Sequence, residues 1–270
     1  MNSGLLDGYV VLITGAGSGM GSAFGRRLAA DGARIVVNDV DEVAAGRFAQ
    51  EIGGEASVFD VSDSSAFDAA VNRVVEHYGR LDVLINNAGI APPRDAERVE
   101  RTIANQMKRM EGRFDELEPT NDLVNLSDDE WNRMLQIHLN GSFFGTRAAL
   151  RHMVPARKGS VVNISSILGL RPAPGAAHYS AAKAGIIALT KSAAQEVAPF
   201  GVRVNVVCPG WVDTPLLAPF DDVTRAGIRM QTPIGRMATP EELAEVVRFL
   251  AGPESSYCVG DVFPVSGGWI

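Results

Sequence analysis

The chain has 270 residues, of which 46% are hydrophobic and 21% charged, so it carries enough apolar material for a full buried core. Its net charge of −7 argues against nucleic acid as a ligand, and its two cysteines, Cys208 and Cys258, lack metal-ligand spacing. The N-terminus has no signal-peptide pattern and no apolar run reaches membrane-spanning length, so we expect a soluble, cytoplasmic protein with no metal, nucleic-acid or membrane partner.

Short Val/Ile/Leu-rich runs alternate with helix-periodic segments. Continuous apolar runs are typical of strands buried on both faces of a parallel sheet, and we expect them at Tyr9–Thr14, Arg34–Asp39, Ala56–Phe59, Val83–Asn86, Val161–Ile164, Val202–Cys208 and Val262–Val265. Helices are expected at about 20–32, 41–52, 63–78, 127–154, 176–199 and 240–251, with N-caps at Ser127 and Thr239. The alternation predicts right-handed crossovers and one doubly wound α/β domain spanning residues 1–270.

A glycine-rich turn follows the first strand. It reads Thr14-Gly15-Ala16-Gly17-Ser18-Gly19-Met20-Gly21, with the spacing G-x-x-x-G-x-G, because Met20 stands at the third glycine position of the commoner G-x-G-x-x-G. Glycines let backbone N–H groups approach a pyrophosphate, and the following helix N-terminus adds positive potential. The turn predicts a dinucleotide site, although a purely structural glycine turn is the alternative.

Acidic and amide residues end the next three strands. Asp39, eighteen residues after Gly21, is placed to accept both ribose hydroxyls of an adenosine and to repel the 2′-phosphate of NADP. Ser18 is uncharged and the segment after Asp39 has no basic residue, so we expect NAD as cofactor, with Asp41 as the better helix-cap candidate. Asp60 is a candidate for the adenine amino group or for a turn. The run Asn86-Asn87-Ala88-Gly89 either contacts the cofactor or only forms a sharp turn.

Residues 90–126 interrupt the alternation of strands and helices, because they form a connection that is long for a compact domain. Apolar residues spaced by three and four predict a helix there, and they are Val99, Ile103, Met107, Met110, Phe114 and Leu117. Three placements stay open: packing on the body of its own domain, a lid over the substrate mouth, or a contact between subunits.

Tyr179 and Lys183 lie four residues apart, and Ser166 precedes the tyrosine by thirteen residues. On a helix, positions i and i+4 share one face, so the phenol and the ammonium project together. A nearby cation lowers the pKa of a phenol, and we expect Tyr179 to exchange a proton with an alcohol oxygen that Ser166 also contacts.

Together these motifs resemble the short-chain dehydrogenase/reductase family over residues 6–268. The resemblance implies a Rossmann fold with strand order 3-2-1-4-5-6-7, NAD-dependent interconversion of a secondary alcohol and a ketone, and three catalytic roles. Tyr179 is then the general acid/base, Lys183 binds the nicotinamide ribose, and Ser166 polarises the substrate oxygen. His138 stands where many members carry a proton-relay Asn, and we expect His138→Asn to retain substantial turnover.

The resemblance also implies a set of cofactor-binding positions and an oligomer. Beside Tyr179 and Lys183, the expected cofactor contacts are Gly15, Gly17, Ser18, Gly19, Met20, Gly21, Asp39, Val40, Asp60, Val61, Asn87, Ala88, Gly89, Pro209, Gly210, Val212 and Thr214. Helix faces near 135–153 and 184–197 are expected to form a homotetramer or homodimer.

The substrate loop is expected at about 212–238, where apolar residues predict a small apolar alcohol or ketone as substrate. Arg171 is read as an exposed arginine in preference to a contact for an acidic substrate. The first alternative is a 3-oxoacyl-thioester reductase acting on acyl carrier protein or CoA, which a basic surface beside the mouth would favour. A catalytically silent NAD sensor and a dehydratase or epimerase acting on nucleotide sugars are the remote alternatives.

Overall fold

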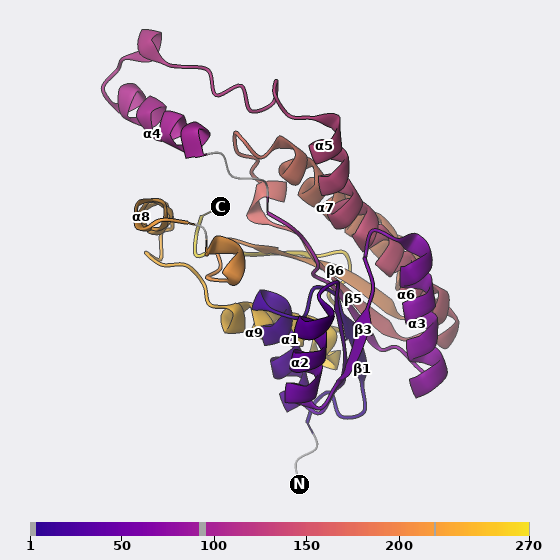
Figure 1. Cartoon of the computed structure of the whole chain (residues 1–270). Helices are drawn as coiled ribbons and strands as arrows, with labels where there is room; N and C mark the ends of the chain where they lie inside the picture. Colours follow the sequence, from indigo (N-terminus) through magenta and orange to yellow (C-terminus); the bar gives the residue numbers. More distant parts are fainter. Residues whose placement is uncertain (1–3, 92–95, 219, 270) are drawn as a thin grey trace.

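The computed structural model describes residues 4–91, 96–218 and 220–269, and Figure 1 traces the chain through them. Residues 92–95 of the expected insertion, residue 219 of the expected substrate loop and the side chain of Val99 lie outside this description. Within the described segments, no helix combines the length and the apolar character needed to cross a bilayer.

Seven parallel strands form one sheet in the order β3-β2-β1-β4-β5-β6-β7, as the family resemblance predicts. The strands are β1 (Val10–Ile13), β2 (Arg34–Asp39), β3 (Glu55–Val58), β4 (Val83–Asn86), β5 (Gly159–Ile164), β6 (Val202–Pro209) and β7 (Val262–Val265). All pairs are parallel, for example Val11 beside Ile35 on one side and beside Val83 on the other. The order reverses between β1 and β4, and in such sheets ligands bind beyond the strand ends at this switch point.

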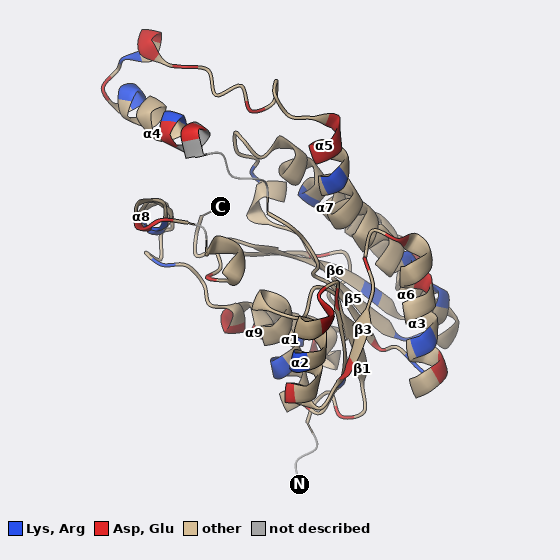
Figure 2. Cartoon of the chain, in the orientation of Figure 1, with Lys and Arg blue, Asp and Glu red and all other residues tan. Residues whose placement is uncertain are grey.

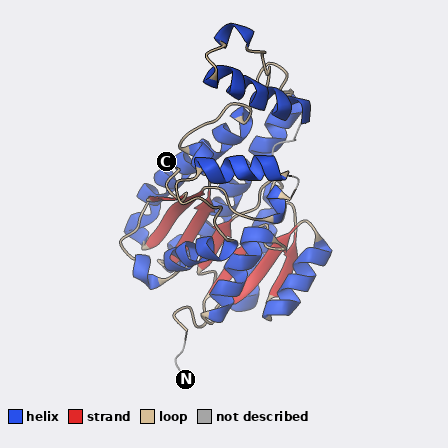
Figure 3. Ribbon diagram, turned by 90° about the vertical axis from the view of Figure 1, so that its left-hand side faces the viewer, coloured by secondary structure: helices blue, strands red, loops and turns tan. Residues whose placement is uncertain are grey.

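Helices cover both faces of the sheet (Figures 1 and 3). One core joins the Val11 and Ile13 side of the sheet to α1 (Gly19–Ala30), α2 (Glu42–Ile52) and α9 (Pro240–Ala251). The other joins the Val10 and Leu12 side to α3 (Ser64–Tyr78), α6 (Gly141–Ala156) and α7 (Ala177–Val197). Alternate residues of one strand thus enter opposite cores, which explains why these strands read as continuous apolar runs.

Two helical predictions differ from the structure. The expected helix 127–154 is α5 (Asp128–Leu135) and α6 joined by a π-helical turn at Gln136–Asn140, where the Gly141 N–H bonds the Gln136 carbonyl. The expected loop 212–238 contains a further helix, α8 (Asp222–Gln231). Only Ile228 of α8 is buried, whereas Val223 and Met230 face solvent.

The inserted segment contains the predicted helix, α4 (Ala96–Met110), but the helix is shorter than the apolar stripe suggests. Gly112, with φ 76°, turns the chain before a 3₁₀ turn at Phe114–Glu116. The helix stands away from the sheet and its covering helices (Figures 1 and 3). Packing of α4 on the body of the domain was therefore the wrong placement among the three.

Candidate active site

The glycine turn after β1 is compact because side chains have no room there. Gly15 has φ 61°, and a Cβ added to it would lie 2.7 Å from the Ala88 Cα. A Cβ on Gly21 would lie 2.3 Å from the Gly15 carbonyl oxygen. The backbone of this turn and the N-terminus of α1 therefore form a narrow cradle that suits a pyrophosphate.

Thr14 and Asn87 fasten this cradle to the end of β4. The Thr14 hydroxyl oxygen accepts from the N–H groups of Asn87 at 3.0 Å and Ala88 at 3.1 Å. The Asn87 amide nitrogen donates to the carbonyls of Thr14 and Gly15, both at 3.0 Å. The buried Asn87 Oδ1 has no partner among the described residues, so Asn87 combines a structural role with one polar atom left for a ligand.

Asp39 lies at the rim of the cradle. Its carboxylate accepts from the Gly17 N–H at 3.0 Å and from the Asp41 N–H at 3.2 Å. Asp41 caps α2 through the Ala44 N–H, so the capping role falls on Asp41 as predicted. A negative charge held against the cradle suits a ribose diol and opposes a phosphate at the same place.

The remaining predicted cofactor residues also have structural contacts. Asp60 accepts from the backbone and the hydroxyl of Ser62 at 2.8 and 2.7 Å, forming a local turn. Gly210 donates its N–H to Val265 at 2.8 Å, and Val212 pairs with Ala238. Thr214 lies beside the cradle, because its Cβ is 3.7 Å from the position of a Cβ on Gly19. The loop after β6 thus closes over the start of α1.

Ser166, Tyr179 and Lys183 come together beyond the end of β5. Ser166 follows β5 and Tyr179 and Lys183 share one face of α7. The Lys183 ammonium donates to the Ile164 carbonyl at 2.9 Å and lies 5.6 Å from the centre of the Tyr179 ring. The Ser166 hydroxyl hydrogen-bonds Tyr179 and accepts from the Leu168 N–H at 3.1 Å.

The electrostatics of this cluster differ from the expectation that Lys183 lowers the tyrosine pKa. Burial raises the pKa of Tyr179 above its ordinary value, and the hydrogen bond from Ser166 only partly opposes this. Burial also lowers the pKa of Lys183 to about 7, so its positive charge is only partial at neutral pH. The expected lowering of the Tyr179 pKa was therefore wrong for the chain without its ligands, because desolvation outweighs the hydrogen bond from Ser166.

His138 lies on the π-helical turn against Tyr179. The two rings meet edge to face at 5.3 Å, and the His138 Nε2 lies 3.1 Å from the Ile90 N–H nitrogen and 3.0 Å from its carbonyl oxygen. Burial, reinforced by the charge of Lys183, holds the pKa of His138 well below its usual range, so the ring is neutral at pH 7. Its role as proton relay stays a prediction, while its hold on the Ile90 backbone is structural.

The His138 ring makes a specific prediction about Gly89. A Cβ on Gly89 would lie 2.4 Å from the His138 Cε1, and the buried ring has no open space to enter. We expect Gly89→Ala to cost about 2 kcal/mol of stability and to lower kcat/KM, whereas Gly89→Ala with His138→Asn regains much of both. Thermal unfolding and steady-state rates measure these changes.

Gly46→Ala is the matched control, since a Cβ there meets nothing within 4 Å and the residue lies inside α2. It should leave the rates unchanged and slightly stabilise the chain. A double variant no better than Gly89→Ala alone would refute a direct clash between these two positions.

Sequence reasoning missed two contributors to this site. Thr14 was read as the end of a strand and the first residue of the glycine motif, without a side-chain role, yet its hydroxyl organises the turn after β4. The Ile164 carbonyl was not considered, yet it holds Lys183 in place. The position of Thr14 immediately before the first glycine was an available signal, whereas a carbonyl acceptor leaves no signal in a sequence.

A cradle at the switch point of a doubly wound sheet, with hydroxyl groups beside it, defines a nicotinamide-dependent oxidoreductase. Comparison with known proteins agrees, since the family model described as short chain dehydrogenase matches residues 9–224. The chain belongs to the short-chain dehydrogenase family.

Three members of known function or structure are similar to this chain over nearly its whole length. The 3-oxoacyl-[acyl-carrier-protein] reductase of Thermotoga maritima is 35% identical over 270 residues, covering 98% of this chain and 99% of that protein. The cis-4-hydroxycyclohexanecarboxylate dehydrogenase of Sinomonas cyclohexanicum is 40% identical over 264 residues, covering 96% of each. The crystal structure of 3-ketoacyl-(acyl-carrier-protein) reductase from Brucella melitensis complexed with NADH has a TM-score of 0.83 at 32% identity, covering 98% of this chain and 99% of that one.

Proposed function

We propose that the chain is an NAD(H)-dependent reductase of 3-oxoacyl thioesters, acting on the C3 carbonyl, which one methylene separates from the thioester carbon. The observation that supports reduction of a carbonyl group is the proximity of Ser166, Tyr179 and Lys183 beyond β5. The names of the Thermotoga and Brucella relatives support the thioester over the small apolar ketone that was the first expectation.

The residues divide the reaction between them. Bound nicotinamide supplies the hydride to the carbonyl carbon, or accepts it in reverse. The Ser166 hydroxyl holds the carbonyl oxygen, and Tyr179 passes its phenolic proton to that oxygen as the alcohol forms. Lys183 stabilises the phenolate left behind, because a negative charge beside it restores the ammonium that burial disfavours.

Asp39 supports NAD over NADP in this proposal. Its carboxylate lies 3.0 Å from the Gly17 nitrogen, so the 2′-phosphate of NADP meets a fixed negative charge at the rim. We expect the kcat/KM ratio of NADH to NADPH to exceed about 100 and to fall at least about tenfold in Asp39→Ser, through a loss with NADH and a gain with NADPH. An unchanged ratio would contradict the role of Asp39. Asp41→Ser, which removes a neighbouring carboxylate but keeps a residue able to cap α2, is the control.

Surface charge near the mouth is mixed (Figure 2). Three basic residues of α4 and α8 are paired with acidic ones, namely Arg101 with Glu97, Lys108 with Glu118 and Arg225 with Asp213. Paired charges of this kind attract an acidic carrier protein weakly. The relatives' names, and not the charge pattern, therefore carry the thioester proposal, and CoA thioesters are the first substrates to test.

A second candidate is oxidation of a ring-bearing hydroxy acid, which the 40% identity to the Sinomonas dehydrogenase favours. One assay, which follows the loss of NADH absorbance, distinguishes the two candidate functions. The substrates compared are acetoacetyl-CoA, acetoacetyl-acyl carrier protein, 4-oxocyclohexanecarboxylate and cyclohexanone. We expect the highest kcat/KM with a thioester, and preference for the cyclic keto acid would replace the proposal with the second candidate.

A further inference from the structure

The polar face of α4 is the face that the chain itself covers. Arg101 donates to the Pro119 carbonyl at 3.2 Å, and Lys108 donates to the Glu116 carbonyl at 2.8 Å. Between them, Asn105 bonds both the carbonyl and the N–H of Glu118, at 2.6 and 2.9 Å. Three residues spaced by four and three thus fasten one side of α4 to the returning segment 116–119, which we call the strap.

The opposite side of α4 is apolar and faces solvent. Ile103, Met107 and Met110 are again spaced by four and three, and their exposed fractions are 38%, 62% and 84%. An amphipathic helix normally buries its apolar stripe and leaves its polar side in water. In α4 this arrangement is inverted, because the strap covers the polar side and the apolar side remains exposed to solvent.

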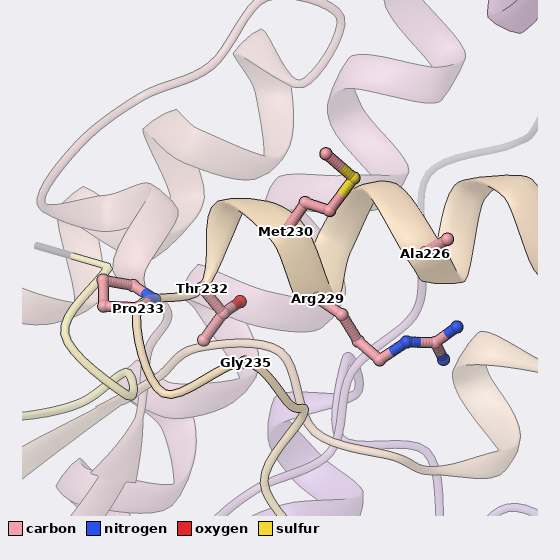
Figure 4. Close-up of a pocket in the computed structure, with 6 residues that line it drawn as sticks. All are labelled: Ala226, Arg229, Met230, Thr232, Pro233 and Gly235. Atoms are coloured by element: carbon pink, nitrogen blue, oxygen red, sulfur yellow. The ribbon is translucent and has the colours of Figure 1, made fainter.

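A second outward apolar side belongs to α8. Ile228 faces the body at 5% exposure, whereas Val223 and Met230, seven residues apart on the other side, are 70% and 87% exposed. Figure 4 shows Met230 projecting from α8 away from Thr232 and Gly235. A hollow of about 480 Å³ runs along this helix, lined by Ala226, Arg229, Met230, Thr232, Pro233 and Gly235.

The two apolar sides face one another. In Figures 1 and 3, α4 lies beyond α8, and the strap passes on the side of α4 remote from α8. Because the strap contacts the polar side, the side with Met107 and Met110 is turned towards α8. The chain after the strap reaches the catalytic end, since the Asp122 carboxylate lies 3.5 Å from the position of a Cβ on Gly175, four residues before Tyr179.

We propose that these two sides, the α4 and α8 walls, receive the apolar tail of the substrate as it leaves the catalytic centre. The inference rests on the proposed function and specifies its substrate class as thioesters with medium or long acyl chains. Methionine suits such walls, because its flexible, polarisable side chain adapts to a chain of variable shape. Met107, Met110 and Met230 then determine the preference for chain length.

The test compares kcat/KM for 3-oxobutanoyl-, 3-oxooctanoyl- and 3-oxododecanoyl-CoA. Each methylene buried between the walls raises kcat/KM by up to about fourfold, so the wild type should favour the longer chains. Met107→Ser with Met110→Ser, and separately Met230→Ser, should lower the long-to-short ratio at least about tenfold. The rate with 3-oxobutanoyl-CoA should stay unchanged, because its short tail does not reach the walls.

Tyr257→Ser is the control, since it removes a large exposed side chain from another element and should leave the ratio unchanged. Failure of the wild type with every thioester overturns the proposed function. Turnover of the thioesters with a ratio that the methionine variants do not alter overturns the walls alone. A fall in molecular mass by light scattering in these variants, with no change in ratio, would assign the α4 side to a second copy of the chain and likewise overturn the proposal.

Discussion

Tyr179→Phe is expected to lower kcat by about 10³ to 10⁴ while NADH still binds. The substitution removes only the phenolic oxygen, which lies within hydrogen-bonding reach of Ser166, and keeps the ring that packs edge-on against His138. Without that oxygen, the proton for the new alcohol has to come from water that the buried site excludes. Single-turnover rates and NADH fluorescence titration measure the two effects separately.

Tyr257→Phe is the matched control, because Tyr257 is almost fully exposed and far along the chain from α7. Its rates should equal those of the wild type. Retention of more than about a tenth of kcat in Tyr179→Phe would remove Tyr179 from the chemistry and place the proton donor elsewhere.

Lys183→Met is expected to have opposite effects on turnover and on stability. Turnover should fall at least about hundredfold, because the phenolate of Tyr179 loses its cation. The unliganded chain should become more stable, because a buried ammonium with a pKa near 7 costs roughly 4 kcal/mol at pH 7 relative to its ordinary 10.5. Loss of the hydrogen bond to Ile164 offsets part of this, leaving a gain of about 2 kcal/mol.

The pH dependence of that gain follows from the direction of the pKa shift. Between pH 7 and 10.5 the unfolded chain binds a proton at Lys183 that the folded chain has released, so rising pH stabilises the wild type. The advantage of Lys183→Met should therefore be largest below pH 7 and vanish towards pH 10.5. Urea unfolding at several pH values tests this, with Lys191→Met on the exposed side of the same helix as control. An advantage that did not change with pH would show that Lys183 keeps its proton in the folded chain.

Local patterns were sufficient to predict the strands, and the family resemblance supplied their order and the candidate catalytic residues. Every strand was placed within three residues at each end, because strands buried on both faces have a strong apolar signature. Helical spacing placed Tyr179 and Lys183 on one face, the family resemblance gave them their roles, and the caps at Ser127 and Thr239 are present as full capping boxes.

The misses have different physical causes. The α8 helix was missed because residues 212–238 were read together as one apolar substrate loop. The raised pKa of Tyr179 and the lowered pKa of Lys183 both come from desolvation by the surrounding fold. The end of α4 at Gly112 was missed because the apolar spacing continues to Leu117 beyond the turn.

The internal bonding of α4 to its strap has a consequence for substitutions in the insertion. The side chains of Arg101, Asn105 and Lys108 donate hydrogen bonds within the inserted segment itself, to carbonyls of residues 116–119. Substitutions at these three positions therefore act first on the inserted segment, because the hydrogen-bond partners belong to its own backbone. With the proposed α4 wall, substitutions in this segment would change the range of substrates without altering Ser166, Tyr179 and Lys183.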